Sequence, residues 1–273
     1  YNSVVNAFYY QALKSMSTIA EDLQKPNEAV YYEQKANNVK NAFTKYFLDT
    51  TTRLIKDGIS TNHSSLHANM FALAFGLVPS ADRHKVLQFI KSRGLLCSVY
   101  GAQFLLDALG QEDNSNYAVH ILTSRDTRSW YNMLREGSTM TMEAWGQAFK
   151  PNQDWNHAWG TAPANYIVRY LMGIQPAKPG FEQVQIKPHP GDLQQASIRY
   201  LTVRGDIQVN FQQKKNSFQL QVSIPGNTTA TIYLPELYKG NASAKNNPVI
   251  TMDGHPQTAT FDNGYWIIDK VPS

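Results

Sequence analysis

The sequence has a single cysteine and no long apolar run. Cys97 is the only cysteine among 273 residues, so an internal disulfide is excluded and the redox compartment stays undecided. Its apolar neighbourhood, with Leu96 and Val99, predicts a small core side chain. No apolar stretch reaches the roughly 18 residues that cross a bilayer, and the first residues do not resemble a secretory signal. We therefore expect no membrane span.

An excess of charge of one sign is also lacking. Lys and Arg number 25 against 21 Asp and Glu, which gives a net charge of +4 without a basic block. Nucleic-acid-binding surfaces need clustered basic residues, so nucleic acid is not expected as a partner. No repeat of fixed spacing and no low-complexity tract is present. The length suits one large or two modest domains with a substantial core.

In the first part of the chain, apolar residues recur at helical spacing. This pattern predicts about seven helices joined by short loops. Pro26 suits the first turn of the second helix, Ser64 or Ser65 suits the cap of the third, and Gly110 and Gly173 suit helix ends. Short connections favour antiparallel neighbours, so the segment is predicted to form a layered or toroidal array of hairpins. The expected helices cover residues 5–23, 26–49, 64–77, 80–92, 98–109, 114–123 and 162–172.

The apolar pattern changes near residues 175–180, and after that point it alternates. Residues 207–211 and 218–224 predict a hairpin that turns at 214–216, and residues 262–264 predict a tight reversal. Roughly eight short strands indicate a small antiparallel β-sandwich. We therefore predict a helical domain over residues 1–176 and a β-sandwich domain over residues 177–273. The other expected strands cover residues 229–234, 249–252, 258–261 and 265–268.

Carboxylates, an imidazole and indoles are concentrated in residues 135–160. Glu143, Asp154 and His157 lie in this segment together with three tryptophans. Aromatic faces stack on sugar rings, and neighbouring carboxylates exchange protons or activate water. The segment therefore predicts a carbohydrate-cleaving site. A tryptophan-rich junction of core helices is the alternative.

Several runs of residues carry a resemblance to one family. They are Ser98 to Phe104, Thr139 to Trp145, Lys150 to Gly160, Gly173 to Pro176, Gly180-Phe181 and Ile186 to Pro188. These runs closely resemble the bacterial α-L-rhamnosidases, over nearly the whole helical segment and the first strands. The resemblance implies an (α/α)6 barrel followed by a β-sandwich. It also implies hydrolysis of terminal α-L-rhamnose from glycosides or polysaccharides, with inversion.

The same resemblance implies that the chain is part of a longer polypeptide. A closed toroid of helical hairpins needs about a dozen helices, about seven are expected here, and the chain does not begin with Met. We therefore expect the later helices of the barrel, an incomplete toroid, followed by the sandwich. The upstream part of the polypeptide is an expected partner. The sequence does not give the cell compartment, although the resemblance favours a periplasmic or secreted location.

Glu143 matches the family's general base. An inverting hydrolase pairs such a base with an acid that protonates the leaving oxygen, at roughly 6.5–9.5 Å. The family's acid lies in an upstream motif rich in Asp, Arg and Glu, which no segment here resembles, so the isolated chain is expected to be inactive. The apolar neighbours Met142 and Ala144 predict a raised pKa for Glu143. An exposed cap glutamate is the alternative.

Six further residues are candidates for shaping a rhamnose pocket. His157 would donate a hydrogen bond to a sugar hydroxyl or to Glu143, and a core histidine is the alternative. Core packing is likewise the alternative for the aromatic candidates. Asp154 would orient His157 or cap a helix. Gly146 stands where many family members carry aspartate, which puts the fine specificity in doubt. The aromatic candidates are Trp145, Trp159, Trp130, Tyr131 and Tyr100.

No metal or organic cofactor is expected. His63 and His67 are four residues apart, as in some zinc sites, but no third ligand is evident, which favours packing of an inner helix.

Two other functions stay open. One is a different helical-toroid carbohydrate enzyme, either a glucoamylase-like hydrolase or a polysaccharide lyase with Tyr131 and His157 as its acid–base pair. The other is a non-catalytic sugar-binding module, which the absence of a general acid favours.

Overall fold

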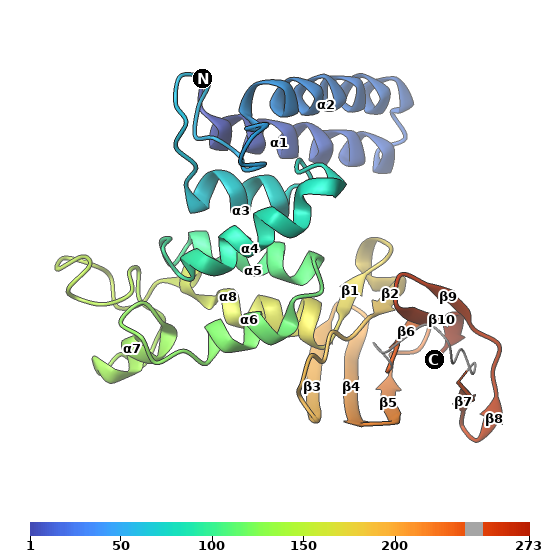
Figure 1. Ribbon diagram of the computed structural model, residues 1–273. Helices are drawn as coiled ribbons and strands as arrows, with labels where there is room; N and C mark the ends of the chain where they lie inside the picture. The colour runs from blue at the N-terminus through green and yellow to red at the C-terminus, as the bar shows by residue number, and fades with distance from the viewer. Residues whose placement is uncertain (238–247) are drawn as a thin grey trace. The chain divides into compact units, whose positions relative to one another are not determined.

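The computed structural model describes residues 1–237 and 248–273. They divide into two compact units, Tyr1–Pro163 and Ala164–Ser273, each described here by itself (Figure 1). The order is helices first and sheets second, as predicted. The domain boundary after residue 176 stays a prediction. In the part of the chain that the structure describes, no helix is long and apolar enough to span a membrane.

The first unit is built from helical hairpins. α1 and α2 lie side by side, α3 packs against α1, α4 and α5, and α5 also contacts α6 (Figure 1). Pro26 begins α2 and the Ser65 side chain caps α3, so both predicted start signals are confirmed. The helices are α1 (Ser3–Asp22), α2 (Pro26–Phe47), α3 (Leu66–Ala74), α4 (Arg83–Arg93), α5 (Gly101–Gln111), α6 (Ser115–Leu122) and α7 (Trp130–Arg135).

Two helix predictions in this unit need correction. Gly110 does not end α5, because it is buried within the helix, which continues to Gln111. The Gln111 side chain donates to the Ala74 carbonyl at 2.9 Å and so fixes that end on α3. α7 was not expected, since a helix of six residues is too short to show an apolar period. The Ser129 side chain caps it by accepting from the Asn132 N–H.

The buried face of α1 is only partly the expected apolar stripe. Leu13 and Ala20 are buried as expected, whereas Val5 and Leu23 are 66% and 62% exposed. Small residues bring α1 and α2 together: the Ser17 hydroxyl donates to the Ala29 carbonyl at 3.0 Å. The buried residues of α1 are therefore a mixture of small and large side chains: Ser3, Ala7, Tyr10, Leu13, Ser17 and Ala20.

The second unit contains the end of the helical segment and the sheets. After α8 (Ala162–Tyr166), which crosses the division between the units, a single π-helical turn covers Ile167–Leu171. One sheet has the strand order β1-β2-β6-β10-β9, a second has β3-β4-β5, and β7 pairs with β8. The strands are β1 (Ile174–Pro176), β2 (Gln183–Ile186), β3 (Gln195–Thr202), β4 (Gly205–Lys214), β5 (Ser217–Ser223), β6 (Thr229–Pro235), β7 (Thr251–Met252), β8 (His255–Pro256), β9 (Thr260–Asp262) and β10 (Tyr265–Pro272).

The pairings confirm the two predicted turns. β4 and β5 pair from Lys214 and Ser217 onward, and β9 and β10 are joined by Asn263 and Gly264, both with positive φ. β1, β2 and β3 were not expected. The pairing is antiparallel except between β2 and β6, which run parallel.

Each of the two larger sheets buries apolar side chains. In β4 the buried residues alternate along the strand, as expected for a strand with one face in a core. Burial of alternate faces is the pattern of a small sandwich. The buried residues include Ile207, Val209 and Phe211 in one sheet and Val184, Ile186, Ala230 and Ile232 in the other.

Gly173 makes the change from helix to strand possible. Its φ is +74°, and a Cβ at this position would lie 2.0 Å from the Lys187 carbonyl carbon. The Gly173 carbonyl accepts from the Lys187 N–H at 3.0 Å, which continues the pairing of β1 with β2. The chain can therefore approach β2 so closely only with glycine at this position.

Gly173→Ala should lower the free energy of unfolding by about 3 kcal/mol, because it combines left-handed strain with a backbone clash. Gly264→Ala is the matched control, since Gly264 has a φ of +81° but no neighbour within 4 Å of a Cβ. That variant should lose only about 1 kcal/mol. Urea denaturation followed by circular dichroism measures both. Equal losses would contradict the close-approach argument.

Candidate active site

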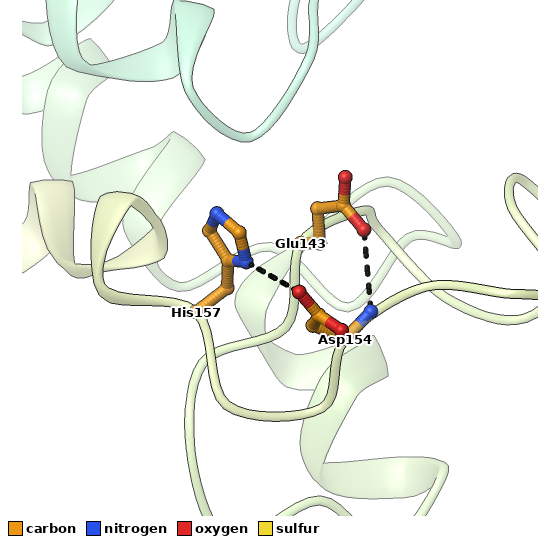
Figure 2. A group of neighbouring side chains, drawn as sticks. All are labelled: Glu143, Asp154 and His157. Carbon is orange, nitrogen blue, oxygen red and sulfur yellow. Dashed lines mark hydrogen bonds and ion pairs between the residues drawn. The ribbon is translucent and has the colours of Figure 1, made fainter.

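Residues 139–157 have an irregular backbone that folds back on itself, and a short 3-10 helix, Ala158–Thr161, follows directly. The Glu143 N–H donates to the Asp154 carbonyl at 3.0 Å, and the His157 N–H donates to the Thr141 carbonyl at 2.8 Å. The Thr141 hydroxyl returns a bond to the His157 carbonyl at 2.7 Å. Three side chains separated by up to fourteen residues in sequence are thereby brought together (Figure 2).

Two side chains, Asn132 in α7 and Glu136 directly after it, bind the backbone of this segment. The Asn132 amide donates to the Trp145 carbonyl at 2.7 Å, and Glu136 Oε2 accepts from the Gln147 N–H at 2.8 Å. A Cβ on Gly146 would lie 2.2 Å from Glu136 Oε1. The Glu136 carboxylate thus occupies the space beside residue 146, where a side chain such as the family's aspartate would begin.

The Glu143 carboxylate is restrained at both oxygens. Oε1 forms an ion pair with the Lys150 ammonium. Oε2 accepts from the Asp154 N–H at 3.2 Å, as Figure 2 shows. The side chain is 17% exposed, so it reaches solvent without lying free in it. A carboxylate has about four lone-pair sites, and two of them are used here, which leaves others for a water molecule.

The predicted direction of the Glu143 pKa shift is wrong. The hydrogen bond from Lys150, followed by that from the Asp154 N–H, holds the pKa of the Glu143 carboxyl below its usual value. The apolar neighbour that prompted the prediction, Met142, points into the core and is fully buried. Charged and hydrogen-bonding partners therefore outweigh desolvation at this position.

His157 and Asp154 form a second pair beside Glu143. His157 Nδ1 lies 3.3 Å from Asp154 Oδ2 (Figure 2). Of the two roles expected for Asp154, the structure shows the pairing with His157. The imidazole also packs on the Trp159 ring, with 4.0 Å between centroids, so its orientation is fixed from two sides.

Two exposed aromatic rings, Trp159 and Tyr100, lie next to each other beside Glu143. The Trp159 indole N–H donates to the Glu143 carbonyl at 3.4 Å, and its ring is 5.4 Å from that of Tyr100. Trp159 and Tyr100 are 43% and 45% exposed. The structure therefore brings Glu143, His157, Trp159 and Tyr100 together.

The other aromatic candidates contact different partners. Trp145 is 3% exposed, and its indole N–H donates to the Cys97 carbonyl at 2.7 Å. Trp130 is half-buried, packs edge-on against Trp145 and donates to the Gly160 carbonyl. The Tyr131 ring is covered by the Arg125 guanidinium at 5.1 Å. Trp145 has the contacts of a core side chain, so the expectation that it walls a sugar pocket is dropped.

Lys150 was missed as a site residue, although the sequence contains a signal for it. It is the only Lys or Arg between Arg135 and Arg169. A single cation in a segment with several carboxylates is a candidate partner for one of them. The spacing could not show which carboxylate it meets, because the backbone between them is irregular.

The three side chains beside Lys150 also form a cluster of potential metal ligands. Among the described residues, one group of potential ligands has its atoms within 4.8 Å of one another, formed by Glu143, Asp154 and His157. Lys150 already supplies a positive charge to this group. His63 pairs with Asp57 at 2.5 Å and belongs to no such group with His67.

One hollow in the first unit lies elsewhere. It has a volume of about 300 Å³ and is lined by Arg93, Tyr117, His120 and Arg128, among others. The Glu143 group does not line it. The aromatic surface beside Glu143 is open, since the rings of Trp159 and Tyr100 are both exposed.

Two tryptophan variants should distinguish a buried side chain that stabilises the fold, Trp145, from an exposed one, Trp159. Trp145→Phe leaves the buried Cys97 carbonyl without its donor, so it should lower the free energy of unfolding by about 2 kcal/mol. Trp159→Phe changes an exposed ring and should stay within about 0.5 kcal/mol of the wild type. Thermal or urea unfolding tests both. A stability loss confined to Trp159→Phe would reverse the assignment.

Comparison with known proteins identifies the family. Residues 1–171 match the model of the bacterial alpha-L-rhamnosidase 6 hairpin glycosidase domain, and residues 173–247 match that of the bacterial alpha-L-rhamnosidase C-terminal domain. An alpha-L-rhamnosidase of Alteromonas sp. (strain LOR) is 26% identical over 91% of this chain and 28% of that protein. One from Streptomyces avermitilis is 25% identical over 85% of this chain and 23% of that protein.

Solved structures show the same fold. The alpha-L-rhamnosidase from Dictyoglumus thermophilum superposes with a TM-score of 0.78 at 23% identity, over 97% of this chain and 30% of that one. The Streptomyces avermitilis enzyme, solved as a complex with L-rhamnose, gives 0.72 at 20% identity over 97% and 26%. This chain spans about a quarter of the length of these relatives. The family-model match over more than half of its residues shows that the chain belongs to the bacterial alpha-L-rhamnosidase 6 hairpin glycosidase family.

Proposed function

We propose that this chain supplies the general base of an inverting α-L-rhamnosidase. Glu143 is the base, and the substrate is a glycoside or polysaccharide with terminal α-L-rhamnose. The observation that carries the proposal is the Glu143 carboxylate, which is anchored at both oxygens beside exposed aromatic rings. It combines a proton acceptor with a surface on which a sugar ring can stack.

In the proposed reaction, Glu143 removes a proton from a water molecule. The water oxygen attacks the anomeric carbon as the bond from that carbon to the leaving oxygen breaks. A carboxylic acid on the other face gives its proton to the leaving oxygen. The lowered pKa of Glu143 keeps the carboxylate ionised, and so ready to accept a proton, at neutral pH.

The sugar-binding residues follow from the same surface. Trp159 and Tyr100 provide the stacking faces, and His157, held by Asp154, donates to a sugar hydroxyl. Trp130 and Tyr131 are proposed at the rim of the site. Trp145 supports the segment from the core and is left out of the binding set.

The general acid is proposed to lie in the polypeptide upstream of this chain. No segment here resembles the family's acid motif, and the chain covers only about a quarter of its relatives. The same upstream part would close the open surface beside Glu143 and complete the pocket. The chain by itself should therefore show little or no hydrolysis of an aryl rhamnoside.

The decisive experiment uses a polypeptide that extends this chain upstream. Glu143→Gln should lower turnover of an aryl α-L-rhamnoside by at least about a hundredfold, because the amide cannot accept the proton. Glu21→Gln, an exposed glutamate on α1, is the control and should keep wild-type rates. Circular dichroism checks that both variants fold. Wild-type turnover in Glu143→Gln would refute the role of Glu143 as base.

Two further measurements separate the other functions. Binding of L-rhamnose without turnover in the extended polypeptide would favour a sugar-binding module. Ultraviolet absorption from an unsaturated product would favour a lyase, because elimination creates a carbon–carbon double bond. Neither signal is expected, and free rhamnose of inverted configuration is the expected product.

A further inference from the structure

We propose that Lys150 is a positioning residue that holds the Glu143 carboxylate in the orientation and the ionised state that water activation requires. This inference rests on the proposed function, since it takes Glu143 as the general base. Lys150 itself contacts neither the water nor the sugar in this scheme. It acts through Glu143 alone.

The geometry gives Glu143 two anchors of different kinds. The Asp154 N–H holds Oε2 from the backbone, and the Lys150 ammonium holds Oε1 from a side chain. With only one of these contacts the carboxylate would rotate about its last bond. The two together fix the plane of the carboxylate and therefore the direction of its free lone pairs.

The backbone of Lys150 is itself held in place. Its N–H donates to the Gly146 carbonyl at 3.4 Å, and its carbonyl accepts from the Gln153 N–H at 3.3 Å. The Gln153 side chain then accepts from the Ala144 N–H at 2.9 Å, next to Glu143. These hydrogen bonds connect Lys150 to Gly146 and, through Gln153, to Ala144, the residue after the proposed base. The backbone from which the Lys150 side chain extends is therefore held in place next to Glu143.

Lys150 is the basic side chain that pairs with Glu143. The titratable groups that face Glu143 are Lys150, Asp154 and His157. Asp154 is a second carboxylate in this group, and its Oδ2 contacts the His157 ring at 3.3 Å. The Lys150 ammonium forms its ion pair with Glu143 Oε1. Each of the two carboxylates therefore has a nitrogen partner of its own.

Removal of the Lys150 ammonium should raise the pKa of Glu143. Without Lys150 the pKa of Glu143 would rise, because the largest cause of its depression is lost. The deprotonated form is the active one, so the acid limb of the kcat/KM profile would move to higher pH. Lys150→Arg keeps the charge and the donor, whereas Lys150→Met keeps most of the side-chain volume and loses both.

The first test measures Glu143 directly in this chain. Carbon-13 NMR of labelled glutamate follows the carboxyl titration, and the resonance missing from Glu143→Gln assigns Glu143. The wild type, Lys150→Arg and the control Lys40→Met, an exposed lysine on α2, should share one midpoint. Lys150→Met should titrate at higher pH. A midpoint unchanged in Lys150→Met would overturn the proposal without reference to activity.

The second test measures kinetics in the extended polypeptide. Lys150→Met should lower kcat by on the order of tenfold at neutral pH. KM should change little, because the variant alters the position of the Glu143 carboxylate and leaves the sugar-binding residues in place. Its acid limb should shift to higher pH, and Lys150→Arg should restore both. A loss confined to KM, or wild-type kinetics, would refute the positioning role. Activity retained in Glu143→Gln would instead refute the proposed function, while the NMR titration would still decide whether Lys150 controls Glu143.

Discussion

The candidate site depends on the backbone contact between residues 141–143 and residues 154–157. The backbone bonds from Glu143 to Asp154 and from His157 to Thr141 turn an irregular segment into a fixed platform. Residues 141–157 form no helix or strand, and only a short 3-10 helix, Ala158–Thr161, follows them, so each bond replaces a constraint that regular structure would supply. Gly160 permits this contact, since a Cβ on it would lie 2.6 Å from the Thr141 Cβ. The positions of the carboxylate and the imidazole follow from this platform.

The electrostatics of the site follow from the same arrangement. A base in an apolar setting would gain affinity for protons, whereas Glu143 loses affinity because it meets an ammonium and a backbone N–H. The lower basicity of the Glu143 carboxylate is offset by its fixed orientation. Because both oxygens are held, its free lone pairs point in one direction. In an inverting reaction the water must approach from one face only, so orientation is the more stringent requirement.

The sequence predicted those features that short-range rules govern. Pro26 and Ser65 marked helix starts, and the alternation around residues 207–224 marked a hairpin, because caps and turns depend on neighbouring residues. The burial of Trp145 and the pair of Lys150 with Glu143 could not be predicted. They depend on how an irregular segment folds back, and no periodicity records that. The motif singles out Glu143, whose role as base stays a proposal, whereas its apolar sequence neighbours gave the wrong sign for its pKa shift.

Gly146 and Glu136 depend on each other for space. Where a side chain would begin at residue 146, Glu136 Oε1 is already present, held by the Asn132 amide at 3.0 Å. Glu136 Oε2 binds the N–H of Gln147, so this carboxylate fixes the backbone two residues beyond Trp145. A larger residue at 146 would displace it and release that anchor. The glycine and the glutamate therefore form one structural unit, and the segment that carries Glu143 is held by the carboxylate of the residue that directly follows α7.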